Sequence, residues 1–119
     1  MELLSYLLIR GVPSHIARFF ECEKSTEYIF VPFEIERETY AIHHFLDNSN
    51  KVGYDLKEVN LQLKTDETEY VVVALAEGDD AICLNLNNGS VSLWLIQSGN
   101  GEMIEIANSF SEFLKKCTR

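Results

Sequence analysis

The feature that most constrains the fold is a hairpin pattern between residues 80 and 96. Apolar residues occupy every second position from Ile82 to Leu86 and again from Val91 to Leu95. This period of two predicts two strands, each with one face in a core. Asn87-Asn88-Gly89 predicts the turn between them, because Asn and Gly tolerate a left-handed backbone. We therefore expect an antiparallel hairpin here.

Two more strands and a helix are predicted around this hairpin. β-branched residues fill Glu69 to Ala76 before it, and Glu102 to Ala107 follows a Gly-rich turn after it. From Ser109 to Cys117 the apolar residues recur at helical spacing, and Ser109 with Glu112 forms a capping-box pattern. The pattern predicts a C-terminal antiparallel meander covered by a helix.

Two short helices are expected at the start of the chain. Leucines between Leu3 and Leu8 form an apolar stripe that Gly11 ends, and Pro13 opens a second helix over Ser14 to Phe20. Tyr28 to Val31 is β-prone and followed by Pro32, which predicts an edge strand that Pro32 terminates.

The middle of the chain gives weaker signals. Tyr40 to Leu46 is compatible with a strand or a helix, and Asp47 to Asn50 predicts a turn. The later part of residues 51–64 alternates as a strand does. We expect one domain over residues 1–119, of the α+β class, with a central, mostly antiparallel sheet between N-terminal helices and a C-terminal helix.

The charge balance restricts the partners. The 119 residues carry a formal net charge of −9. Nucleic acids and anionic membranes are bound through Lys and Arg, so this balance opposes both and favours a basic protein partner, if there is one. No signal peptide or long apolar run is recognisable, so the cytoplasm is the expected location. Three cysteines with no Cys-x-x-Cys spacing are interpreted as reduced structural thiols.

Few residues suggest catalysis. His43 and His44 are adjacent, so on a strand their side chains should face opposite ways, and His15 is alone in the sequence; we expect no metal and no cofactor. Asp79 and Asp80 follow Gly78 in a predicted turn. No nucleophile elbow or phosphate-binding loop occurs. We expect no enzyme activity.

Aromatic residues interspersed with acids suggest a protein-binding segment, although an edge strand with a solvated charged face would look similar. Trp94 is compatible with packing or with a binding surface. The candidate partner-binding residues are an acidic-aromatic segment, Glu27, Tyr28, Glu34, Glu36 and Glu38, and a second acidic patch, Asp79 and Asp80.

Three stretches together resemble a known family. Gly78 to Asn85, then Asn88-Gly89-Ser90-Val91 with a Trp-bearing strand, and then Ile106 to Leu114 follow the order of motifs in the SUKH superfamily, the Smi/Knr-type proteins. Leu8 to Pro13 also resembles the opening of one subfamily. The resemblance implies an α+β fold with a central antiparallel sheet and no enzyme activity.

The resemblance also implies a function. Many bacterial members of the superfamily are immunity proteins that neutralise a toxin domain, often a nuclease or a deaminase, and eukaryotic relatives are regulators that act through protein contacts. We therefore expect a cytoplasmic immunity protein that occludes the active site of a toxin. The alternative is a regulatory adaptor without a toxin partner. The shared motifs are structural, so they assign no functional residue.

Overall fold

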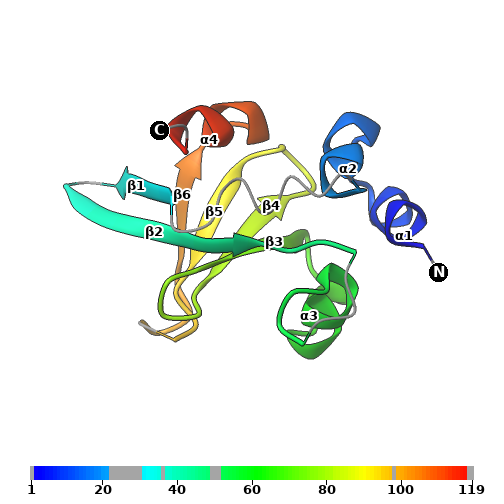
Figure 1. Cartoon of the computed structure of the whole chain (residues 1–119), viewed down its shortest axis with the longest axis horizontal. Helices are drawn as coiled ribbons and strands as arrows, with labels where there is room; N and C mark the ends of the chain where they lie inside the picture. Colours follow the sequence, from blue (N-terminus) through cyan, green and yellow to red (C-terminus); the bar gives the residue numbers. More distant parts are fainter. Residues whose placement is uncertain (1, 22–30, 36, 49–51, 98, 118–119) are drawn as a thin grey trace.

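The computed structural model describes residues 2–21, 31–35, 37–48, 52–97 and 99–117. Within them, one six-stranded sheet has the order β1-β2-β3-β4-β5-β6, and every neighbouring pair is antiparallel (Figure 1). The strands are β1 (Val31–Ile35), β2 (Glu38–Phe45), β3 (Tyr70–Ala76), β4 (Ala81–Asn85), β5 (Val91–Trp94) and β6 (Met103–Ala107). The helices are α1 (Leu3–Arg10), α2 (Ser14–Glu21), α3 (Leu56–Gln62), the short 3-10 helix η2 (Thr65–Glu67) and α4 (Phe110–Lys116). The α+β class and the antiparallel meander are confirmed.

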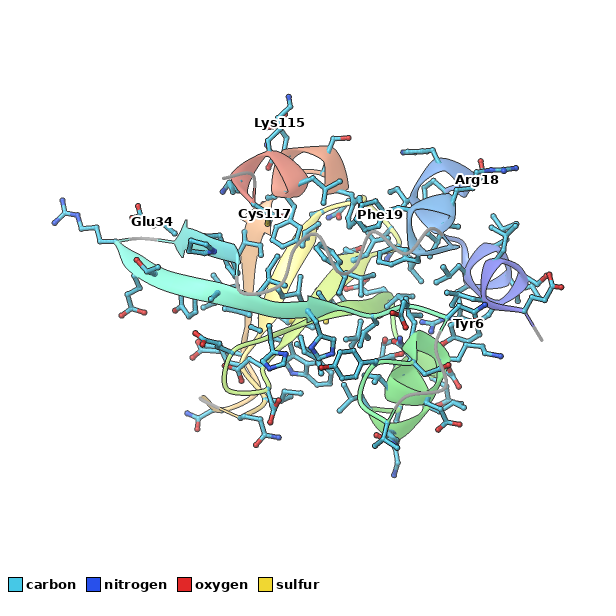
Figure 2. All side chains as sticks on the ribbon, in the orientation of Figure 1. Tyr6, Arg18, Phe19, Glu34, Lys115 and Cys117 are labelled. Carbon is cyan, nitrogen blue, oxygen red and sulfur yellow. The ribbon has the colours of Figure 1, made fainter. Side chains whose placement is uncertain are left out.

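Strand register divides the sheet into two faces. We call the face that carries Ile82 the core face and the face that carries Cys83 the outer face. Phe45 lies in the same cross-strand row as Ile82. Its ring meets those of Phe19 in α2 and Phe110 in α4, with centroids 5.3 and 6.3 Å apart. α2 and α4 therefore cover the core face, as Figures 1 and 2 show.

The predicted hairpin is present as β4 and β5. Gly89 has a φ of 77° in the turn, and the Asn85 side chain accepts a hydrogen bond from the Asn87 N–H at 2.8 Å. The expectation that each strand buries only one face is wrong for β4, because all five of its residues are buried. A strand in the middle of a sheet with material on both sides loses the alternation of exposure.

The terminal helices are confirmed with small changes. Gly11 ends α1 with a φ of 98°, and α2 follows Pro13. The Ser109 side chain accepts from the Glu112 N–H at 3.1 Å at the start of α4. The apolar stripe of α1 is narrower than predicted, since Leu8 is 45% exposed.

The edge strand differs from its prediction. Most of the predicted segment, residues 28–30, lies outside the described residues. β1 begins at Val31 and continues through Pro32, so Pro32 does not terminate it. β1 is the first strand of the sheet order, as predicted for an edge. An edge strand tolerates Pro because the backbone on its open side makes no hydrogen bonds to a neighbouring strand, so a missing N–H costs nothing there.

In the middle of the chain one prediction was open and another is wrong. The segment compatible with strand or helix is strand β2. The predicted later strand of residues 51–64 is instead α3, which buries Leu56, Val59 and Asn60 and leaves Leu61 54% exposed. Asp55 caps it by accepting from the Glu58 N–H at 3.1 Å. Asn60 then joins α3 to β3 through the backbone N–H and C=O of Val72.

Candidate functional site

The predicted acidic-aromatic segment is only partly described. Glu27, Tyr28 and Glu36 lie outside the described residues. Glu34 on β1 and Glu38 on β2 are both exposed, and the Glu38 carboxylate accepts a hydrogen bond from the Tyr40 hydroxyl at 2.8 Å. Glu34 and Glu38 therefore both lie on the β1–β2 hairpin and are exposed to solvent.

The second predicted patch separates into two roles. Asp79 is exposed and has a left-handed φ of 66° beside Gly78, in the predicted turn. Asp80 is only 3% exposed, and its carboxylate accepts from the Gln97 N–H at 2.7 Å. Asp80 ties the β5–β6 connection to the β3–β4 turn, so it does not contribute to the accessible surface.

The topology gathers the exposed acids at one end of the sheet. Because successive strands alternate in direction, the β1–β2, β3–β4 and β5–β6 connections leave from the same end, and the β3–β4 and β5–β6 turns lie together at the lower left of Figure 1. We call this the acidic end; its exposed acids are Glu34, Glu38, Glu77, Asp79 and Glu102. Arg37 is exposed in the β1–β2 turn.

Most of the sheet contains no basic residue at all. No Lys or Arg occurs between Thr65 and Leu114, a stretch that includes β3 to β6. The acids of the same stretch are Asp66, Glu67, Glu69, Glu77, Asp79, Asp80, Glu102, Glu105 and Glu112. Charges of one sign concentrated on one region attract a partner of the opposite sign and increase the association rate.

An apolar row crosses the outer face next to the acidic end. Leu75, Ala81, Trp94 and Met103 are direct cross-strand partners on β3, β4, β5 and β6. Ala81 is fully buried, Leu75 and Trp94 are partly exposed, and Met103 is 36% exposed. Trp94 thus packs against the core and also reaches the surface. The row was missed from the sequence, because only the strand register brings these residues together.

The histidine pair contradicts its prediction. A β-bulge at His43 shifts the register between Ile42 and His44, so both rings lie in contact with centroids 4.8 Å apart. Their Nδ1 atoms are 2.6 Å apart, and His44 Nε2 lies 2.9 Å from the Gly53 carbonyl. Burial lowers the pKa of His44, which is also stacked on the Tyr54 ring at 3.9 Å.

These contacts fix the proton positions on the two rings. A carbonyl oxygen can only accept, so His44 Nε2 carries a proton and its Nδ1 accepts from His43 Nδ1–H when both rings are neutral. Within the described ranges, no group of three or more His, Cys, Asp or Glu side chains is arranged to hold a metal ion. The histidine pair is therefore explained by its hydrogen bonds.

The described cysteines are buried. Burial raises the pKa values of Cys83 and Cys117 to about 12, so both thiols stay protonated at neutral pH. A protonated thiol is a poor nucleophile, which fits the structural role predicted for them. Cys22 lies outside the described residues.

None of the described helices is both long and apolar enough to span a lipid bilayer.

Comparisons with known proteins give one finding. The SMI1 / KNR4 family (SUKH-1) matches residues 5–116, from α1 to the end of α4. Neither the curated proteins nor the solved structures include a match. The family match spans nearly all of the fold described above, and the chain belongs to the SMI1 / KNR4 family (SUKH-1).

Proposed function

We propose that this chain is an immunity protein that binds a toxin domain and neutralises it by occluding its active site. The observation that carries the proposal is the family match over residues 5–116, because membership fits a non-catalytic immunity or regulatory protein that acts through protein contacts. Its place of action is the cytoplasm, where a toxin with an intracellular target has to be stopped.

The charge distribution supports a basic partner. A nuclease or a nucleic-acid deaminase binds a polyanion and needs a cationic cleft to do so. Of the acidic end, Glu77, Asp79 and Glu102 lie in residues 65–114, a stretch that has no Lys or Arg. Their carboxylates can therefore complement such a cleft. This feature disfavours nucleic acid and anionic membranes as partners of this surface.

A survival assay tests the proposal. A candidate toxin domain, chosen because its expression kills the host cell, is expressed with and without this protein, and surviving cells are counted. We expect survival only when both are present. A catalytically inactivated toxin domain is the control for toxicity unrelated to the enzyme. Death in both cases, with this protein soluble and folded, would contradict immunity and leave the regulatory adaptor, the other role that family membership fits.

A further inference from the structure

The outer face of the sheet is covered on only one side by described residues. Asn60 of α3 donates to the Val72 carbonyl of β3 at 2.9 Å, and Tyr54 stacks on His44, the register partner of Leu75 on β2. The segment before α3 therefore covers the outer face at β2, beside Leu75. In Figure 1, α3 lies to one side below the sheet, away from the β3–β4 and β5–β6 turns. The apolar row from Leu75 to Met103 lies toward those turns.

The composition of this open part is unusual for a solvated sheet face. An antiparallel sheet with one face in water normally alternates apolar and polar residues, with the polar ones outward. Here the outward positions next to the turns are Leu75, Trp94 and Met103, all partly exposed or exposed. Aromatic residues and Met are enriched in the buried centres of protein interfaces. The row has the residue types of an interface centre.

Acids surround the apolar row. Glu77 and Asp79 occupy the turn beside Leu75, Glu102 precedes Met103, and Glu105 follows on the same face of β6. Asp79 is close enough to act electrostatically on His44, although burial is the larger influence on the His44 pKa. Glu34 also faces outward, because its register partner Thr39 alternates with the core-face residue Tyr40.

We infer that this outer-face patch, Leu75, Trp94 and Met103 with Asp79, Glu102 and Glu105 around them, docks a protein surface on which an apolar side chain is surrounded by Lys and Arg. The apolar side chain packs on Trp94, and the cations pair with the rim carboxylates. The inference rests on the proposed function, since it specifies where the basic partner binds. An apolar centre supplies the affinity, and the acidic rim supplies specificity and a fast encounter.

Trp94 offers a direct test, because it is the only tryptophan in the chain. Fluorotryptophan incorporated into this protein alone gives one fluorine resonance, whatever tryptophans the partner contains. The toxin domain of the survival assay and, separately, a Trp-free peptide of alternating Lys and Leu are titrated in while the resonance is recorded. We expect both probes to shift it or broaden it.

A matched pair of variants complements the spectrum. Met103→Lys places a cation on the patch, whereas Leu61→Lys makes the same kind of change at the exposed position on α3. We expect Met103→Lys to weaken toxin binding by about tenfold or more and Leu61→Lys to leave the dissociation constant unchanged. Urea unfolding of both variants checks that each is folded.

The outcomes separate the inference from the proposed function. Suppose that the toxin domain binds without changing the fluorine resonance, and that Met103→Lys binds it as tightly as the wild type does. The patch is then overturned and immunity stands. If the toxin domain does not bind at all and the peptide shifts the resonance, the patch stands with a basic partner other than this toxin, and the proposed function fails. If neither probe shifts the resonance, the patch is overturned.

Discussion

A single bulge decides how the two adjacent histidines behave. Neighbouring residues in a regular strand face opposite ways, but the extra residue at His43 turns both rings to one side. His44 is then enclosed by His43, Tyr54 and the Gly53 carbonyl. The spacing of residues in the sequence could not reveal this, because a bulge is defined by the partner strand.

This enclosure predicts a pH dependence of stability. Burial lowers the folded-state pKa of His44 below its ordinary value of 6.5, and the facing groups His43, Asp47 and Asp79 modify the shift. The unfolded state therefore binds the proton more readily. The contribution of His44 is fully present above pH 6.5 and is lost as pH falls through the lowered pKa.

Urea unfolding at several pH values between about 5 and 7 measures this effect. The wild type should lose more stability on acidification than His44→Gln, whose side chain cannot titrate. His15→Gln, at an exposed position in α2, should follow the wild type. Equal losses for wild type and His44→Gln would refute the assignment.

Asn60 joins a helix to the sheet through its side-chain amide. The amide donates to the Leu56 and Val72 carbonyls at 2.8 and 2.9 Å, and its oxygen accepts from the Val72 N–H at 2.8 Å and from the Thr65 hydroxyl at 2.6 Å. The residue is fully buried, so water cannot replace these bonds. The four contacts tie α3, η2 and β3 together.

Asn60→Ala should lower the free energy of unfolding by about 2–4 kcal/mol, because it leaves several buried polar groups unpaired. Gln62→Ala, on the exposed side of the same helix, should change it by less than about 0.5 kcal/mol. Urea denaturation measures both. Similar small changes in the two variants would show that the Asn60 network contributes little.

At the scale of elements, local signals predicted most of the fold. The β4–β5 hairpin and the capped helix α4 each contain their own turn or cap residues, so the sequence pattern was sufficient. α3 was missed because Leu61 and Leu63 extended an apparent alternation, whereas packing against β3 selects the helix face of Leu56, Val59 and Asn60. Tertiary contacts override local pattern in such segments.

The β1–β2 hairpin is the element on which the predicted binding segment remains a hypothesis. Replacing Glu34, Glu36 and Glu38 together with Lys should weaken toxin binding by about tenfold at low salt and by less at high salt, since surface charges are screened. The melting temperature should stay unchanged, because Glu34 and Glu38 are exposed. Calorimetric titration at two salt concentrations measures the effect.

A control triple reverses Glu2, Glu58 and Glu67, exposed acids at the helical side of the molecule. It makes the same change in net charge and should affect binding much less. If both triples weaken binding equally, only the overall charge matters, and the hairpin is not part of the interface.

At the scale of the whole molecule, the meander order places the acids. In an antiparallel sheet whose strands are neighbours in sequence and in space, every second turn lies at the same end of the sheet. Glu34, Glu38 and Asp79 therefore lie at the same end. The acidic residues could be read from the sequence, whereas their position at one end of the sheet follows from the strand order. The apolar row through Trp94 could not be read from the sequence, since it depends on the register of four strands.

Under the proposed function, this chain inhibits a toxin by binding to its active site. The most direct measurement adds the purified protein in increasing amounts to the purified toxin domain of the survival assay and follows the toxin's enzymatic activity. We predict that activity falls linearly and disappears near equimolar protein, as expected for tight occlusion of an active site. Full activity in the presence of excess folded protein would contradict the claim.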